Sequence, residues 1–156
     1  MPPVSLGIRA PDFELASTNG NTFVLSSERG KSNLVLFFLS DAGGGANTQV
    51  AEAFRDASEL FRGARTTVVG ICSAPLNELQ AFKEKLSLPY ELLIDDETIG
   101  SLYGVHVRRG LGPFSRQKFS RSTFLLDRTG VIRRIFRDVN VKEHINEVLA
   151  SVDTDL

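Results

Sequence analysis

The run Leu34-Val-Leu-Phe-Phe-Leu39, followed at once by Asp41-Ala-Gly-Gly-Gly-Ala-Asn-Thr48, decides the fold of this chain. The first run is apolar at every position, which is typical of a central strand covered by helices on both faces. The second run is rich in glycine and ends in Asn47 and Thr48, residue types that cap the start of a helix. This order predicts the strand–loop–helix unit of an α/β fold.

Further elements alternate on both sides of this unit. An N-terminal hairpin turns at Asn19-Gly20, and the segment from Val105 to Ser120, rich in Gly and Arg, is predicted to be a loop. Strands that alternate with helices predict a layered α/β domain with parallel strand pairs, closed by an antiparallel hairpin. The predicted strands are 12–15, 22–25, 34–39, 66–72, 90–94, 122–126 and 131–136, and the predicted helices are 48–63, 75–86, 97–103 and 141–152.

Apolar spacing also predicts which side of two helices faces the core. The last helix should turn Val148 inward and carry His144 on its outer side. The helix after the glycine-rich loop should bury one stripe and stop at Gly63; the stripe is Val50, Ala53, Phe54, Ala57, Leu60 and Phe61.

The bulk composition is that of an ordinary globular protein. The chain has 156 residues, which suits one domain over 1–156, and its net charge of −1 gives no general attraction to nucleic acid or acidic lipid. Its one cysteine, Cys72, cannot form an internal disulfide, which favours a reducing compartment. The N-terminus lacks the basic start and apolar run of a signal peptide, and no apolar stretch approaches the roughly 20 residues that span a bilayer. A cytoplasmic protein without membrane contact is expected.

The element order and several short phrases resemble the peroxiredoxins, in particular the bacterioferritin-comigratory or Q-type branch of the AhpC/TSA family. The resemblance implies a thioredoxin-like three-layer α/β/α fold with an N-terminal β-hairpin, and a thiol-dependent peroxidase of antioxidant, redox function without a bound cofactor. The matching phrases, in chain order, are Gly7-Ile-Arg-Ala-Pro-Asp-Phe-Glu-Leu15, Asn19-Gly20, Gly30-Lys31, Leu34-Val-Leu-Phe-Phe38, Val68-Val-Gly-Ile71, Leu93-Ile-Asp-Asp96, Tyr103-Gly-Val105 and Arg121-Ser-Thr-Phe-Leu-Leu-Asp-Arg-Thr-Gly130.

The resemblance also implies a catalytic loop with proline, threonine four residues on, and cysteine three further. At the helix N-terminus the cysteine becomes a thiolate, while the threonine and a distant arginine hold the peroxide oxygens. The matching positions here are Ser40, Gly44 and Asn47, and only Arg121 stands where the family has its arginine. The position of the resolving cysteine is Glu52. An asparagine amide has no lone pair fit to attack peroxide, so the family mechanism cannot run at residue 47.

Three functions remain open from the sequence. The first is a peroxiredoxin-like binding or regulatory module with a degenerate active site. The second is a thiol-dependent peroxidase or reductase whose nucleophile has moved to Cys72, with an external thiol as its reductant. The third is a homodimeric interaction protein, because the family often associates through faces near this loop.

Two candidate sites follow from the loop and from Cys72. Gly43, Gly44 and Gly45 expose backbone N–H groups that, with Asn47, Thr48 and Arg121, would bind a small anion or peroxide; the alternative is a flexible connection with capping side chains. Cys72 ends an apolar strand, so its default role is an inert core residue. That strand should lie beside the one ending at Leu39, which would bring Cys72 near the loop.

The remaining polar groups give weaker indications. Asp95-Asp96 should end a strand, no metal ligand set surrounds His106 or His144, and no metal site is predicted. The segment 105–122 contains no acid, and its cations either form a solvated loop or bind an anionic ligand. Phe114 and Phe119 lie among them, which is thin support for nucleic acid. These cations are Arg108, Arg109, Arg116, Lys118 and Arg121.

Overall fold

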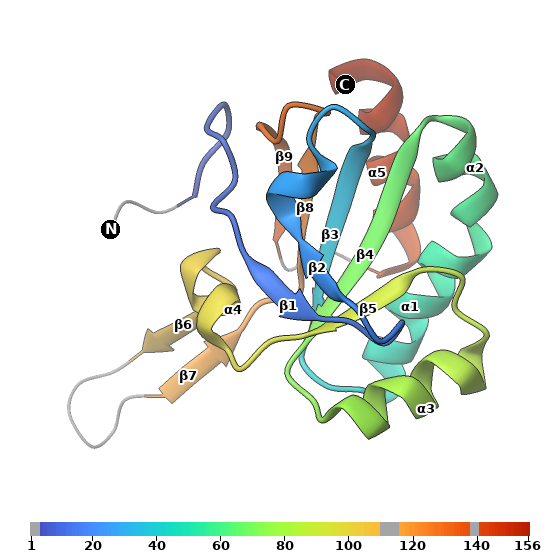
Figure 1. Cartoon of the computed structure of the whole chain (residues 1–156), viewed down its shortest axis with the longest axis vertical. Helices are drawn as coiled ribbons and strands as arrows, with labels where there is room; N and C mark the ends of the chain where they lie inside the picture. The colour runs from blue at the N-terminus through green and yellow to red at the C-terminus, as the bar shows by residue number, and fades with distance from the viewer. Residues whose placement is uncertain (1–3, 110–115, 138–140) are drawn as a thin grey trace.

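The computed structural model describes residues 4–109, 116–137 and 141–156, with side chains described outside 106–119, 141–143 and 154–155 (Figure 1). The elements are β1 Glu14–Ala16, β2 Thr22–Val24, the 3-10 helix η1 Leu25–Glu28, β3 Asn33–Leu39, α1 Gly45–Asp56, α2 Ser58–Gly63, β4 Thr66–Cys72, α3 Leu76–Leu86, β5 Glu91–Ile94, α4 Thr98–Leu102, β6 His106–Arg109, β7 Arg116–Phe119, β8 Ser122–Leu126, β9 Ile132–Arg137 and α5 Val141–Asp155.

The central sheet has five strands in the order β5-β4-β3-β8-β9. β3 is parallel to β4, with Leu39 opposite Cys72, and β4 is parallel to β5. β8 is antiparallel to both β3 and β9, and β1 forms a separate hairpin with β2. The predicted parallel pairs, the closing hairpin and the N-terminal hairpin are therefore confirmed.

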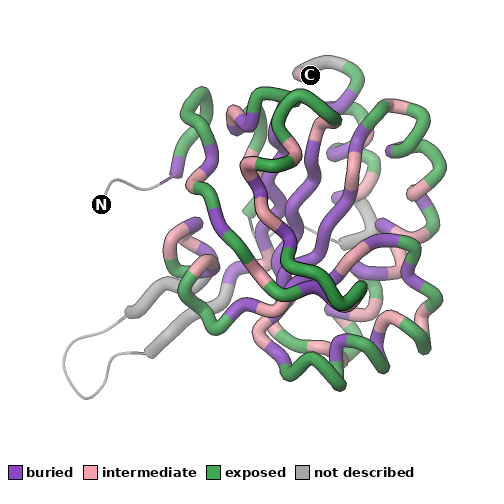
Figure 2. The backbone as a smooth tube through the Cα atoms, in the orientation of Figure 1, coloured by how far each residue is buried: buried purple, intermediate pink, exposed green. Residues whose placement is uncertain are grey.

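Both faces of the sheet are covered, which is why β3 is apolar throughout. Helices α1, α2, α3 and α5 cover one face, while α4 and the β1–β2 hairpin pack on the other. Figure 2 shows the buried residues concentrated along the central strands, with exposed residues on the outer sides of the helices. Because the two faces are sealed, the carboxyl ends of β3 and β4 and the loops that follow them are the places open to function.

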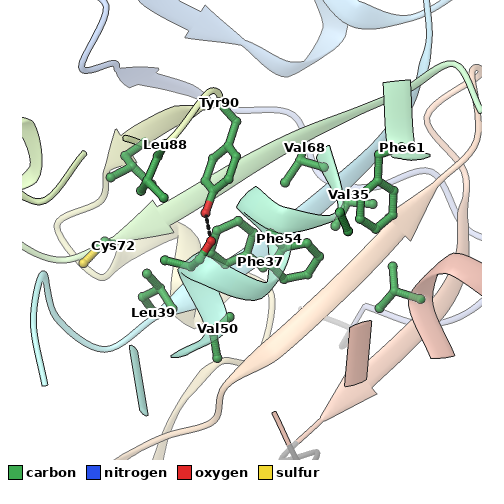
Figure 3. Close-up of a cluster of buried hydrophobic side chains, with 14 of the residues drawn as sticks. Val35, Phe37, Leu39, Val50, Phe54, Phe61, Val68, Cys72, Leu88 and Tyr90 are labelled. Carbon is green, nitrogen blue, oxygen red and sulfur yellow. Dashed lines mark hydrogen bonds between the residues drawn. The ribbon is translucent and has the colours of Figure 1, made fainter. Parts of the chain in front are cut away.

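Aromatic packing fixes α1 against the sheet. The rings of Phe37 on β3 and Phe54 on α1 stack with their centroids 4.5 Å apart, and Tyr90 meets Phe37 edge-on at 5.4 Å. The Tyr90 hydroxyl donates a hydrogen bond of 2.7 Å to the Ala51 carbonyl in the middle of α1 (Figure 3). Apolar contact and one satisfied buried hydroxyl together hold the helix that carries residue 47.

Gly70 allows this packing because it has no side chain. A Cβ atom at Gly70 would lie 2.7 Å from Leu92 Cδ2 and 2.8 Å from Phe37 Cζ. We expect Gly70→Ala to lower the free energy of unfolding by about 1–3 kcal/mol, the usual cost of overpacking a dense core. Urea denaturation measures the free energy of unfolding of this variant. Gly63→Ala is the control, because no atom lies within 4 Å of the new Cβ there. Equal stability of the two variants would contradict the packing described.

Two predictions about elements are wrong. The single helix predicted over 48–63 is two helices, α1 and α2, separated at Ala57. The change of axis turns Phe61 into the core and leaves Leu60 64% exposed, although one helical stripe would bury both. The segment 105–120 is not simply a loop, because β6 and β7 pair as an antiparallel hairpin beside α4.

The prediction that His144 lies on the outer side of the last helix is also wrong. The side chain is 5% exposed and lies edge-on to Phe136 and Phe54, with centroids 5.2 Å and 6.1 Å away. Its Nε2 is hydrogen-bonded to Thr123 Oγ1 at 2.7 Å, while Nδ1 finds no hydrogen-bond partner within the described structure. Burial therefore lowers the pKa of His144 from 6.5 to about 4.

This low pKa predicts a pH dependence of stability. Between pH 6.5 and 4 the unfolded chain binds a proton at His144 that the folded chain does not, so stability falls as pH decreases through this window. The full loss is about 3 kcal/mol below pH 4, from the difference between the two pKa values. Urea denaturation at a series of pH values should show this slope in the parent chain. In His144→Gln the slope should be flatter, and an unchanged slope would contradict a buried neutral imidazole.

No helix among the described residues is both long enough and apolar enough to cross a membrane.

Candidate functional site

The loop between β3 and α1 determines where the helix begins. Gly44 precedes α1 with φ 80° and ψ 154°, a backbone conformation that favours glycine, and no side chain caps the helix. The Thr48 N–H donates to the Gly44 carbonyl at 3.0 Å, which closes the first turn. The prediction that Asn47 and Thr48 cap the helix is therefore wrong, because both residues lie inside its first turns.

Asn47 is the centre of a small polar network. Its side chain is 5% exposed, and its Nδ2 donates to the Gly43 carbonyl at 2.8 Å and to Ser40 Oγ at 3.1 Å. Its Oδ1 accepts a hydrogen bond from Arg121 Nε at 3.4 Å and one from Ser40 Oγ at 3.3 Å. Three of the predicted site residues, Ser40, Asn47 and Arg121, thus meet at one place.

Strand register brings Arg121 to the loop. Phe37 on β3 lies opposite Thr123 on β8, so continuing the antiparallel register two residues places Arg121 opposite Leu39, beside Ser40. Ser40 follows β3 directly, and Arg121 directly precedes β8. A residue 74 positions away in the chain therefore contacts Asn47 through the sheet.

Sequence reasoning missed a second polar cluster next to Arg121, formed by Ser120, Ser122 and Arg137. On the two sides of Arg121 the buried hydroxyl groups of Ser120 and Ser122 are hydrogen-bonded to each other at 2.9 Å. Arg137 on β9 donates to the carbonyl groups of Tyr103 at 3.1 Å and Gly104 at 3.2 Å, and to Ser122 Oγ at 3.4 Å. The alternation Ser-Arg-Ser before a strand was a signal for the first pair, but no sequence signal identifies the carbonyl partners of Arg137.

The site carries positive charge around a neutral side chain. The guanidinium of Arg121 contacts Asn47, and residue 47 lies in the first turn of α1, where the helix dipole is positive. The Asn47 amide provides dipoles but no charge, so it does not neutralise either group. The arrangement can therefore hold a small anion or polar ligand, but it offers no nucleophile.

Cys72 lies at the same edge of the sheet, but its side chain is buried. The parallel register places Cys72 opposite Leu39, as the sequence predicts. The side chain is 1% exposed, and burial, together with the charges of Asp41 and Glu78, raises the pKa of the thiol from 9.0 to about 12. A reactive cysteine needs the opposite environment, with access to solvent and a lowered pKa. In the close-up of the core, Cys72 lies at the rim of the apolar cluster (Figure 3).

The side chains of the adjacent acids Asp95 and Asp96 accept hydrogen bonds from backbone N–H groups. Buried Asp95 accepts hydrogen bonds from the N–H groups of Ile99 at 3.0 Å and Gly100 at 2.7 Å, at the start of α4. Asp96 Oδ1 accepts one from the Thr98 N–H at 3.1 Å. Across the described part of the chain no group of three or more His, Cys, Asp or Glu side chains could hold a metal ion.

Among the cations of the basic segment, Arg121 is the one whose side chain the structure describes. The side chains of Arg108, Arg109, Arg116 and Lys118 lie outside the described residues, as do those of His106, Phe114 and Phe119. The backbone places the four cations on the β6–β7 pair, where Arg108 lies opposite Gln117 and Arg109 opposite Arg116.

Comparisons with known proteins identify the family of the chain. The sequence model of the AhpC/TSA family matches residues 6–135. The chain is 32% identical to Peroxiredoxin Bcp of Bacillus subtilis over 151 residues, covering 96% of this chain and 95% of that protein. It is 35% identical to the chloroplastic Peroxiredoxin Q of Suaeda salsa, covering 94% of this chain and 66% of that protein.

Solved structures show the same fold. The structure of Peroxidoxin BcpB from Mycobacterium tuberculosis aligns with a TM-score of 0.84 at 29% identity, over 95% of this chain and 96% of that chain. Peroxiredoxin Q of Xanthomonas campestris aligns with a TM-score of 0.85 at 22% identity, over 90% of this chain and 89% of that chain. The fold is thus the thioredoxin-like fold of the peroxiredoxins, as the sequence predicts. The chain belongs to the AhpC/TSA family, and its relatives include proteins of the Bcp and peroxiredoxin Q type.

Proposed function

We propose that this chain is a peroxiredoxin-family protein without the thiol peroxidase reaction, and that it acts as a binding or regulatory module. The observation that carries the proposal is the Asn47 network, in which a neutral amide occupies the first turn of α1 beside Arg121. We take Ser40, Gly44 and Asn47 as the counterparts of the family's proline, threonine and cysteine. On this assignment no group in the loop can attack a peroxide bond.

The burial of Cys72 supports the same proposal. A displaced nucleophile would have to reach peroxide, yet the thiol is buried and its pKa is raised to about 12. Cys72 lies close enough to the loop for such a role, because its strand position is opposite Leu39. The thiol, however, is protonated at neutral pH and is closed to solvent, and both properties oppose a role as nucleophile. A peroxidase or reductase that uses Cys72 is therefore the less favoured alternative.

The ligand that we propose for the loop is a small anion, with peroxide as a neutral alternative that would bind without reacting. Arg121 and the N–H groups of Gly45 and Asn47 would supply the contacts. Because Asn47 is neutral, a bound anion would offset the positive charge of Arg121 and of the helix N-terminus. In the family, the cysteine thiolate would offset that charge. Gly43 and Gly44 leave room for a ligand to approach the backbone.

NMR titration of the chain with sulfate, chloride and acetate tests this binding. We expect the amide resonances of Gly44, Gly45 and Asn47 to shift with saturation, and Arg121→Gln to weaken the effect by about tenfold. Arg128→Gln is the matched control, because Arg128 is an exposed cation away from the loop. Resonances that do not move, or that move equally in both variants, would refute the anion site.

Three further predictions accompany this proposal. A homodimer formed through faces near the loop remains a prediction that sedimentation over a wide concentration range would test. The extent of one domain over 1–156 and a cytoplasmic location also remain predictions, the latter based on the single buried thiol.

A further inference from the structure

A groove lies beside the glycine-rich loop, on the side that faces α3. Its volume is about 310 Å³, and its walls are the backbone of Gly43 and Gly44 on one side and helix α3 on the other. Phe82 and Leu86 provide an apolar floor. This volume lies at the lower end of the roughly 300–1,000 Å³ that small-molecule sites enclose.

Two opposite charges stand at the ends of the groove. Glu78 and Lys85 both line it, and neither forms an ion pair within the part of the chain that the structure describes. They are seven residues apart on α3, so they are separated by two helical turns, about 10.5 Å along the axis. Phe82 lies between the two charges along the helix, and Leu86 follows Lys85 directly.

We propose that this groove binds a short peptide of about three residues with free termini. An extended chain spans about 3.3–3.6 Å per residue, so a tripeptide matches the separation of the two charges. Its ammonium group would face Glu78, its carboxylate would face Lys85, and its central side chain would lie on Phe82. The spacing of the two charges and the apolar Phe82 between them select this class of ligand over a simple ion.

The peptide groove shares the backbone of Gly43 and Gly44 with the loop, but none of the side chains of the Asn47 network lines it. Ser40, Asn47 and Arg121 do not line the groove, and Glu78 and Lys85 do not contact Asn47. Arg121→Gln should therefore leave peptide binding unchanged. The peptide proposal and the proposed function of the loop can accordingly fail separately.

NMR titration with the tripeptide Ala-Leu-Ala tests the proposal. The free peptide is compared with a form acetylated at its N-terminus and amidated at its C-terminus. We expect the amides of Gly43, Gly44 and Ala81 to shift, and the free peptide to bind at least about tenfold more tightly than the capped form. No saturable shift at millimolar peptide, or equal affinity of the two forms, would overturn the proposal.

Charge-reversal variants supply the sharper test. Glu78→Lys and Lys85→Glu alone should each weaken binding by about tenfold or more, because one terminus then meets a like charge. The double variant Glu78→Lys/Lys85→Glu should recover to within about threefold of the parent, because the peptide can bind in the opposite direction. A double variant as weak as either single variant would refute recognition of both termini.

Lys83→Glu is the matched control. Lys83 is also a basic residue in the last turn of α3, but it does not line this groove. Lys83→Glu and Lys85→Glu both place a negative charge in the last turn of α3, so both oppose the helix dipole. Only Lys85→Glu changes a charge that lines the groove. We expect Lys83→Glu to bind the peptide as the parent does, and a loss equal to that of Lys85→Glu would overturn the proposal.

Discussion

The Asn47→Cys variant is expected to consume hydrogen peroxide with dithiothreitol at least about 100-fold faster than the parent chain. The new thiol would lie in the first turn of α1, beside the Arg121 guanidinium that now contacts the Asn47 amide. A helix N-terminus and a nearby cation both favour the thiolate, so its pKa should fall below the usual value of about 8.5. Stopped-flow or coupled assays of peroxide loss would measure the rate.

Three controls separate this explanation from a nonspecific thiol effect. Asn47→Ser should remain inert, because a hydroxyl at this place is not activated. Adding Arg121→Gln to Asn47→Cys should remove most of the gained rate. Adding Cys72→Ser should leave the gained rate unchanged. A rate for Asn47→Cys that equals the parent rate would contradict the proposal that the missing thiol at residue 47 limits the reaction.

On the proposed assignment of Gly44 to the family's threonine position, a threonine would not fit the backbone found here. Gly44 has φ 80°, a conformation that costs a β-branched residue roughly 1–3 kcal/mol. For this reason the single Asn47→Cys variant is a cleaner test than a triple variant that also alters Ser40 and Gly44.

Cys72 in the folded chain is expected to react with iodoacetamide about 1,000-fold more slowly than in the unfolded chain. Raising the pKa of the thiol from 9.0 to about 12 lowers the fraction of thiolate at neutral pH by this factor, and burial slows access further. Mass spectrometry of the labelled chain over time measures the rate. Iodoacetamide is suitable because only the thiolate reacts.

The control is the same labelling in concentrated urea, where Cys72 should react as an ordinary exposed thiol. In the Asn47→Cys variant, residue 47 should be labelled first and Cys72 much later. Native labelling of Cys72 as fast as in urea would contradict its sealed environment. Such a result would also favour the alternative in which Cys72 is the nucleophile of a peroxidase or reductase.

The sequence predicts most of the fold because apolar runs and turn residues act locally. β3 is apolar from Leu34 to Leu39 and β4 has no charged residue, so their central place in the sheet can be predicted without the structure. Helix faces are harder to predict, because one helix can pack against several elements at once. His144 looks polar and outward by spacing, but α1, β8 and β9 all reach that side of α5.

Prediction of the site depended on the resemblance. Ser40, Asn47 and Arg121 come together as the family pattern implies, because the register of β3 and β8 fixes Arg121 beside Ser40. The pattern of capping residues failed, because the positive φ of Gly44 starts the helix before Asn47. The hydrogen bonds of Arg137 could not be predicted, because its partners are carbonyl groups remote in sequence.

The rate of hydrogen peroxide consumption with dithiothreitol, in the parent chain and in Cys72→Ser, shows most directly whether this protein lacks thiol peroxidase activity. A catalytically competent peroxiredoxin serves as the positive control. The account predicts that both chains consume peroxide no faster than buffer, because residue 47 carries no thiol and Cys72 is buried and protonated. Rapid consumption by the parent that disappears in Cys72→Ser would contradict it, and would make this protein a peroxidase with a relocated nucleophile.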